Sequence, residues 1–166
     1  MPHPSIKRFT LVLLRDKERI LLGHKKRGFG QGKWNGFGGK VEPGEDIIDA
    51  AHRELFEECG MRCTDLRQLG LMHFDFEGQH TTMEVHIFVG RQFTGTPIES
   101  DEMRPKWFHE CEVPYDKMWL DDKVWWPPFL ADKYFFGWCL YRGTEMIVDS
   151  TLETVHSLDA VLNRVL

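Results

Sequence analysis

The sequence predicts one α/β domain of the α+β type, in which strands and helices alternate irregularly. Its 166 residues match the size of a single compact domain. Short β-favouring runs are bounded by polar turns, and one stretch changes to a helical period. Because no repeat or low-complexity tract marks a boundary, residues 1–166 are expected to form one domain.

The first expected elements are a β-hairpin and a glycine-rich loop. Residues 9–14 are nearly all apolar, and an apolar run resumes at residues 19–23 after a polar break. In residues 28–44, glycines alternate with aromatic side chains such as Trp34 and Phe37. This segment is too rich in glycine for a helix and too aromatic for a flexible linker. It predicts an ordered loop that brings backbone close to another group.

A helix is expected over residues 46–59, with Gly60 as its C-terminal stop. At about 100° per residue, its positions separate into two arcs. The apolar arc contains Ile48, Ala51, Leu55 and Cys59, and the other arc contains Glu54, Glu57 and Glu58. The helix is therefore predicted to be amphipathic, with a carboxylate cluster on its solvent-facing side.

The middle of the chain predicts further strands and a second helix. Residues 69–76 and 83–89 are strand-like, and another short strand is expected around Trp107. A helix is predicted over residues 121–133, and it contains Pro127 and Pro128. Because proline lacks a backbone N–H, this pair should kink the helix or mark its beginning.

The C-terminal part is expected to end in another helix. Ser150 is followed three residues later by Glu153, a pattern that resembles a capping box. A last helix is therefore predicted to begin there. The remainder, about residues 155–166, is treated as a C-terminal tail.

Composition limits the classes of partner. The net charge is −5 and the pI is about 5.9, so the chain has no overall basic footprint for a nucleic-acid polymer. No apolar run approaches the roughly 20 residues of a membrane span. The four cysteines form no CxxC pair, and no leader precedes them, which favours free thiols in a reducing compartment. We expect a soluble cytoplasmic protein, with the mitochondrion and nucleus as further locations.

Three glutamates within one helical turn point to a divalent cation. Like charges at this spacing destabilise a helix by a few tenths of a kcal/mol per pair, and a cation offsets that repulsion. Hard carboxylate oxygens suit Mg²⁺, with Mn²⁺ as an alternative. For an isolated Glu-Glu pair, a solvated acidic face would be the simpler interpretation.

The surrounding residues favour the metal site. Residues 39–61 follow a fixed pattern, namely Gly39, five residues, Glu45, seven residues, Arg53-Glu54-Leu55, one residue, Glu57-Glu58, one residue, Gly60 and Met61. This pattern resembles the Nudix box, the signature of the Nudix hydrolases. The resemblance implies an α/β/α sandwich around a mixed sheet, which fits the irregular alternation better than a doubly wound parallel sheet.

The same resemblance implies roles for individual residues. Glu54, Glu57 and Glu58 would hold the metal and form the catalytic centre. Arg53 would orient these glutamates, in agreement with its i, i+4 relation to Glu57. The carbonyl of Gly38 and the side chain of Glu102 would be further metal ligands. Lys40 either meets a phosphate or is a solvated lysine.

The chemistry implied is metal-dependent pyrophosphohydrolysis. Metal ions neutralise phosphate oxygens and activate a water, which displaces pyrophosphate from the α-phosphorus. Glu57, Glu58 and Glu102 are all candidates to accept the proton of that water.

A narrower resemblance concerns the substrate. Residues 25–30, 34–40, 95–97, 99–105 and 118–122 are similar to the eukaryotic MutT-type oxidised purine nucleoside triphosphatases. These enzymes remove 8-oxo-dGTP, 2-hydroxy-dATP and methylated purine nucleotides such as O6-methyl-dGTP and N6-methyl-dATP, which sanitises the nucleotide pool. The implied substrate-binding residues are Thr10, Lys25, Asn35, Phe37, Gly38, Gly39, Lys40, Phe74, Phe76, Met83, Trp119, Leu120, Asp121, Asp122 and Trp125.

Asp121 and Asp122 are the most informative of these residues. Burial and like charge each raise a carboxyl pKa, so adjacent aspartates beside an apolar ring should not both ionise. We hypothesise that they share a proton, which would let one pocket accept several modified purines. The alternative is that they cap the following helix. His24 and Leu120 depart from the relatives and leave the ranking of substrates open.

Two other classes of function remain as alternatives. A Nudix hydrolase of ADP-ribose, a dinucleoside polyphosphate or an RNA cap would be expected to carry extra insertions or a basic channel. A non-catalytic Nudix module that binds a nucleotide or a protein would be expected to lose the glutamates, which this chain retains. Relatives are commonly monomers, and a monomer is expected here.

Overall fold

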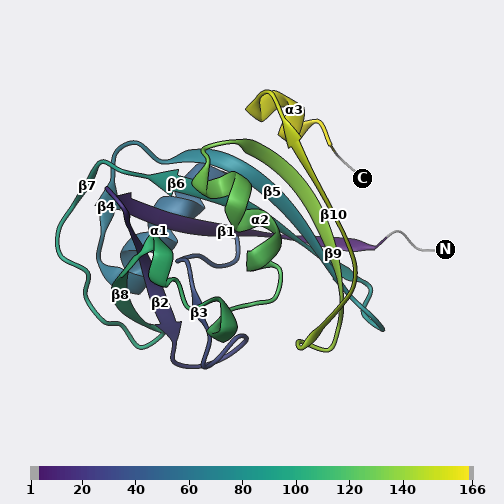
Figure 1. Cartoon of the computed structure of the whole chain (residues 1–166), viewed down its shortest axis with the longest axis horizontal. Coiled ribbons are helices and arrows are strands. Elements are labelled where there is room, and N and C mark those ends of the chain that lie inside the picture. Colours follow the sequence, from purple (N-terminus) through teal and green to yellow (C-terminus); the bar gives the residue numbers. More distant parts are fainter. Residues whose placement is uncertain (1–3, 165–166) are drawn as a thin grey trace.

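The computed structural model describes residues 4–164, so the ends of the expected 1–166 domain lie outside the described residues. Its main sheet is mixed and follows the order β10-β9-β5-β6-β1-β2-β3, with β8 paired to β2 (Figure 1). β1 runs parallel to β6, and β5 runs parallel to β9. These strands are β1 (Ser5–Asp16), β2 (Arg19–Lys25), β3 (Trp34–Asn35), β5 (Arg67–Phe76), β6 (Thr81–Gly90), β8 (Met103–His109), β9 (Tyr134–Arg142) and β10 (Met146–Val155).

The remaining elements are short strands and helices. β4 (Arg62–Cys63) pairs with β7 (Phe93–Thr94) in a separate ribbon. The α-helices are α1 (Ile47–Cys59), α2 (Asp122–Leu130) and α3 (Leu158–Leu162), and two 3₁₀ turns are η1 (Glu110–Glu112) and η2 (Tyr115–Lys117). None of the described helices combines the length and apolarity that a membrane crossing requires.

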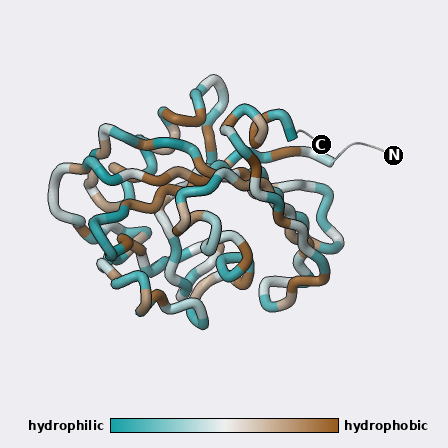
Figure 2. Tube along the Cα trace, turned by 45° about the horizontal axis from the view of Figure 1, so that its top comes forward, coloured by the Kyte–Doolittle hydropathy of each residue, from teal (hydrophilic) through white to brown (hydrophobic). Residues whose placement is uncertain are grey.

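The expected sandwich is confirmed, because α1 and α2 pack on opposite faces of the sheet. Successive side chains of a strand point to opposite faces, and both faces of β1 are buried. Leu13 belongs to the cluster that includes Trp125 of α2, whereas Val12 belongs to the cluster that includes Leu55 of α1. Burial on both sides explains the nearly continuous apolar run of β1. Figure 2 shows the hydrophobic segments concentrated along the central strands.

The glycine-rich loop is ordered, as expected, and lies against β1. The N–H of Phe37 donates to the carbonyl of Val12, and the N–H of Thr10 donates to the carbonyl of Gly39. A Cβ at Gly38 would lie only 1.7 Å from the carbonyl oxygen of Thr10. Glycine is therefore required at this position for the loop to approach the strand.

The helix that carries the glutamates forms as predicted and ends at Gly60, which has a φ of 72°. Two expectations about its faces are wrong. Ile48 is 38% exposed, because it lies in the first turn of α1, before the helix packs closely on the sheet. Glu58 is only 5% exposed, because its side chain turns toward the backbone of Gly38. The three glutamates therefore do not share one solvent-facing side.

The predicted capping box at Ser150–Glu153 is wrong, because this segment lies within β10. Pairing with β9 supplies the backbone hydrogen bonds that a helix would otherwise have provided. The last helix begins later, after Ser157, whose Oγ accepts a hydrogen bond from the N–H of Ala160 at 3.1 Å. Part of the expected tail is thus strand and helix.

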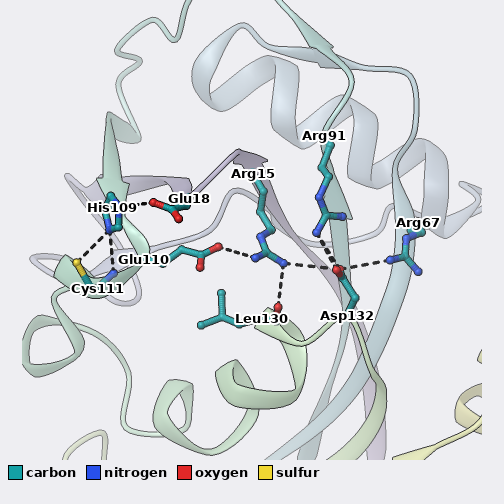
Figure 3. Close-up of polar contacts among 9 residues, drawn as sticks. All are labelled: Arg15, Glu18, Arg67, Arg91, His109, Glu110, Cys111, Leu130 and Asp132. Carbon is teal, nitrogen blue, oxygen red and sulfur yellow. Dashed lines mark hydrogen bonds and ion pairs between the residues drawn. The ribbon is translucent and has the colours of Figure 1, made fainter.

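Pro127 and Pro128 lie within the C-terminal half of α2 and do not begin it. The helix ends soon after them, and Asp132 fixes the following turn (Figure 3). Arg91 donates to both carboxylate oxygens of Asp132 at 3.0 and 2.9 Å, and Arg15 donates to the carbonyl of Leu130 at 3.2 Å. These contacts tie the end of α2 to the C-terminal ends of β1 and β6.

Candidate active site

An apolar cavity of about 260 Å³ lies beside Phe9, Thr10 and Leu11 of β1. Strands β5, β6 and β9, the glycine-rich loop and the start of α2 supply its other walls. It brings together most of the expected substrate-binding residues, namely Thr10, Lys25, Asn35, Gly38, Gly39, Phe74, Phe76, Met83, Trp119, Asp121, Asp122 and Trp125. Residues far apart in the sequence therefore share one pocket.

Three expected substrate-binding residues lie elsewhere. Phe37 is fully buried and packs in the hydrophobic cluster beneath α1. Lys40 is exposed, and its carbonyl accepts a hydrogen bond from Arg53. Leu120 is 36% exposed on the connection between Trp119 and Asp121. None of the three lines the apolar cavity, and their roles remain predictions.

Three aromatic residues that line the pocket were not expected from the sequence, namely Phe9, Phe29 and Tyr141. The ring of Phe29 lies 4.9 Å from that of Trp119, and Tyr141 stacks on Phe76 at 5.4 Å. Phe29 stands between Gly28 and Gly30, and this Gly-Phe-Gly pattern in the sequence could have identified it as the tip of a turn. In the structure both glycines have a positive φ. Tyr141 carries no such signal, because its position depends on the pairing of β9 with β5.

Asp121 and Asp122 lie at the floor of this pocket and are 5% and 1% exposed. Burial raises the pKa of both carboxyl groups, and the charge of Asp121 raises the pKa of Asp122 further. Asp121 occupies the N-cap position of α2, but its side chain makes no capping hydrogen bond. The carboxylate instead receives Tyr141 and Trp125, which argues against the helix-capping alternative.

A second, polar cleft of about 470 Å³ adjoins the apolar pocket. Lys25, Gly38, Gly39 and Glu58 line both spaces. The cleft also contains Arg27, Glu54, Glu57, Ser100, Asp101 and Glu102. The supplementary glutamate expected from a distant part of the chain is thus brought into the same space as the glutamates of α1.

Glu58 lies at the boundary between the two spaces. Its Oε1 accepts a hydrogen bond from the N–H of Gly38 at 2.8 Å. Burial is the main cause that raises the pKa of Glu58 to about 7. In the absence of a cation, this carboxyl group is therefore near the midpoint of its titration at neutral pH.

Arg53 holds the other glutamates of the box in place. Its guanidinium donates to Glu54 at 2.9 Å and to Glu57 at 3.2 Å. It also donates to both oxygens of Glu45 at 2.7 and 2.9 Å, which lowers the pKa of Glu45 to about 2. This geometry agrees with an orienting role for Arg53.

Glu102 receives two cationic side chains in this cleft. Arg27 donates to it at 2.7 Å and Lys25 at 3.1 Å. These contacts lower the pKa of Glu102, with the hydrogen bond from Arg27 as the main cause. Glu102 is therefore a charged oxygen donor at neutral pH.

The donor set fits a hard divalent cation in its chemistry. Carboxylate oxygens and backbone carbonyls are the ligands that Mg²⁺ prefers. A Cβ at Gly39 would lie 2.6 Å from Glu54 Oε1, so the glycine leaves room for the carboxylate. Within residues 4–164, no three His, Cys, Asp or Glu groups already converge as a complete ligand set.

Comparison with known protein families matches residues 4–129 to the NUDIX domain. The chain therefore belongs to the Nudix family. A related solved structure is the MutT protein from Bacillus halodurans, with a TM-score of 0.80 and 26% identity. The match covers 89% of this chain and 97% of that one. It agrees with the mixed sheet and flanking helices described above.

Two curated relatives match nearly the whole chain, and both are named oxidized purine nucleoside triphosphate hydrolase. The protein from Danio rerio is 49% identical over 152 residues, which cover 92% of this chain and 97% of that protein. The protein from Mus musculus is 46% identical over 149 residues, covering 90% and 96%. An NAD-capped RNA hydrolase from Pseudomonas syringae is 31% identical over 115 residues, which cover only 39% of its length.

Proposed function

We propose that this protein hydrolyses oxidised purine nucleoside triphosphates to the monophosphate and pyrophosphate. The observation that carries the proposal is that the apolar pocket and the polar cleft adjoin and share the lining residues Lys25, Gly38, Gly39 and Glu58. An aromatic pocket with buried aspartates suits a flat base, and the adjoining carboxylate-rich cleft suits a metal-bound triphosphate. The names of the two curated relatives with the highest identity quoted above support the same substrate class.

The base is held by stacking and by its polar edge. Trp119 and Phe29 offer aromatic faces, and stacking of a base on an aromatic side chain contributes roughly 1–3 kcal/mol. Asn35 supplies both a donor and an acceptor at the pocket wall. The apolar walls exclude water from the base, so the phosphates extend toward Lys25 and the cleft.

The reaction takes place in the cleft. A divalent cation held there, Mg²⁺ in our proposal with Mn²⁺ as a substitute, would supply charge neutralisation for the phosphates and activation of the attacking water. Glu54, Glu57, Glu58, Glu102 and the carbonyl of Gly38 would hold it. Arg53 keeps the glutamates aligned, and Lys25 and Arg27 meet the phosphates. Glu57, Glu58 or Glu102 accepts the proton as water attacks the α-phosphorus and pyrophosphate leaves.

The proposed substrates are 8-oxo-dGTP and 2-hydroxy-dATP, with O6-methyl-dGTP and N6-methyl-dATP as further members of the class. Their removal would keep modified purines out of DNA and so sanitise the nucleotide pool. A monomeric state and a cytoplasmic, mitochondrial or nuclear location remain predictions from the sequence. Substrate roles for Phe37, Lys40 and Leu120 also remain predictions.

The test is release of pyrophosphate from 8-oxo-dGTP and dGTP, compared with cleavage of the diphosphate in ADP-ribose and NAD-capped RNA, whose two monophosphate products are separated by chromatography. We expect metal-dependent turnover that is fastest with 8-oxo-dGTP and is lost when the metal is chelated. Faster cleavage of ADP-ribose or capped RNA would reject the substrate class. If folded protein with metal turned over none of these compounds, a non-catalytic binding module would replace the enzyme.

A further inference from the structure

Tyr141 places its hydroxyl group in a fixed orientation at the floor of the apolar pocket. The side chain is 1% exposed, and its oxygen lies 2.5 Å from Asp121 Oδ1 and 3.0 Å from the backbone nitrogen of Asp121. Because a backbone N–H can only donate, the hydroxyl oxygen accepts that bond. The tyrosine proton is therefore directed at Oδ1.

The second oxygen of Asp121 also receives a donor. Trp125 Nε1 lies 2.8 Å from Asp121 Oδ2, and an indole nitrogen is a donor only. A proton placed on either carboxylate oxygen would compete with one of these donors. The two hydrogen bonds therefore favour the ionised form of Asp121, as hydrogen bonds to a carboxylate generally do.

Asp122 has the opposite environment. It is 1% exposed, and its Oδ2 has no hydrogen-bond partner among the described residues. The ionisable groups around it are Asp121, Tyr115 and Cys139, and burial raises the pKa of each. None of these groups supplies positive charge. Trp126 and the backbone at Trp119 favour the ionised form of Asp122, but burial and the charge of Asp121 outweigh them and raise its pKa, so the neutral form is favoured at Asp122.

We propose that Tyr141 is a positioning residue for base specificity, which holds Asp121 as the hydrogen-bond acceptor and leaves the shared proton on Asp122. The pocket then offers a purine edge one acceptor and one donor in a fixed order. A base whose edge carries the complementary order is preferred over one that needs the reverse order. This proposal deepens the proposed function and rests on it only for the identity of the substrates.

Removal of the tyrosine hydroxyl should release the proton from this fixed position. In Tyr141→Phe the ring remains, but Asp121 loses the donor at Oδ1. Loss of a hydrogen bond to the carboxylate of Asp121 raises the pKa of this group. The lower of the two pKa values of the aspartate pair should therefore increase by about one unit. The proton should then be distributed over both carboxyl groups.

The direct experiment is ¹³C NMR of the aspartate carboxyl groups in the substrate-free protein between pH 4 and 9. In the wild type we expect Asp121 to be ionised and Asp122 protonated at pH 7. Tyr141→Phe should shift the titration as described, and Trp125→Phe should shift it in the same direction. The matched control is Tyr134→Phe, on the same strand but away from the cavity. An ionised Asp122 at pH 7 in the wild type would overturn the assignment.

A second measurement connects the proton to specificity. We expect Tyr141→Phe to bring the ratio of kcat/KM for 8-oxo-dGTP and 2-hydroxy-dATP at least threefold closer to one, while Tyr134→Phe leaves it unchanged. An unchanged ratio in Tyr141→Phe would reject the specificity role. The NMR titration needs no turnover, so it tests the proton position even if neither nucleotide is a substrate.

Discussion

The protein places two groups of carboxylates in adjoining spaces with opposite surroundings. Asp121 and Asp122 lie in a pocket of about 260 Å³ whose walls are mostly apolar and aromatic. The glutamates of α1 line a cleft of about 470 Å³ that also contains Lys25 and Arg27. The same functional group thus meets mainly apolar and aromatic walls in one space, and Arg27 with backbone donors in the other, while Lys25 lines both spaces.

This difference separates two uses of a carboxyl group. In the apolar pocket, burial favours a retained proton, so an aspartate can donate a hydrogen bond to a neutral base. In the cleft, Arg53 donates to Glu54 and Glu57, and the hydrogen bond from Arg27 lowers the pKa of Glu102, although burial raises the pKa of Glu54. Glu58 stands between the two and shares features of both. Substitutions on each side should therefore fail in different ways.

The largest effect is expected at the boundary. In Glu58→Gln the amide oxygen can still accept from the N–H of Gly38, but the negative charge for the cation is lost. We expect kcat to fall by at least about 100-fold, or roughly 3 kcal/mol, with near-normal folding. Steady-state kinetics and titration with Mg²⁺ measure this change. Glu112→Gln, at an exposed position on η1, is the control, and equal activity in the two variants would exclude a catalytic role for Glu58.

The next effect should appear in binding and not in chemistry. Trp119→Ala removes the stacking face from the apolar pocket, which should raise KM by about 5- to 150-fold, equivalent to roughly 1–3 kcal/mol. The value of kcat should change little, because the cleft is untouched. Trp119→Phe should fall between the wild type and the alanine variant. If kcat fell as strongly as in Glu58→Gln, the assignment of base binding to the apolar pocket and of chemistry to the polar cleft would be wrong.

The local features of the fold could be predicted from the sequence. The box residues 39–61 and the helical period identified α1, because a helix depends on contacts within four residues along the chain. The roles expected for the glutamates and Arg53 came from the resemblance of the same residues to the Nudix box. The β1–β2 hairpin followed from two apolar runs around a polar break. Each of these features is encoded by neighbouring residues.

The parts that the sequence could not predict depend on distant contacts. Tyr141 reaches the pocket because β9 pairs in parallel with β5, and no residue near it in the sequence signals this. The segment from Ser150 has the pattern of a helix start, but pairing with β9 makes it a strand. Glu58 follows the spacing of its neighbours, yet the loop at Gly38 covers it and leaves it buried. Tertiary contacts override local propensity in each case.

A stability measurement can test whether Asp122 is protonated in the apolar pocket. Asp122 has a raised pKa in the folded state and about 3.9 when unfolded, so the folded state binds more protons above pH 4. Its contribution to stability is complete below pH 4 and is lost as pH rises toward the folded pKa. Asn cannot ionise, so Asp122→Asn should not lose this stability as pH rises. Relative to the wild type, its free energy of unfolding should increase by about 1.4 kcal/mol for each pH unit between the unfolded and the folded pKa of Asp122.

The free energy of unfolding from urea titrations at pH 5 and pH 8 provides the readout. Asp122→Asn should gain stability relative to the wild type between these two values. Asp116→Asn, at an exposed position on η2, should show no such trend. If the difference between Asp122→Asn and the wild type were the same at both pH values, Asp122 would not carry a proton in the folded protein over this range.

The smallest effect is expected at Leu120, which lies between two residues of the pocket. Leu120 departs from the relatives and left the ranking of substrates open, but its side chain is 36% exposed and does not line the cavity. Substitutions at such surface positions usually change free energies by less than about 0.5 kcal/mol, or roughly twofold. We therefore expect Leu120→Ala to change kcat/KM for 8-oxo-dGTP and 2-hydroxy-dATP by no more than about twofold. A tenfold change for either substrate would mean that Leu120 sets the backbone that presents Trp119 and the aspartates.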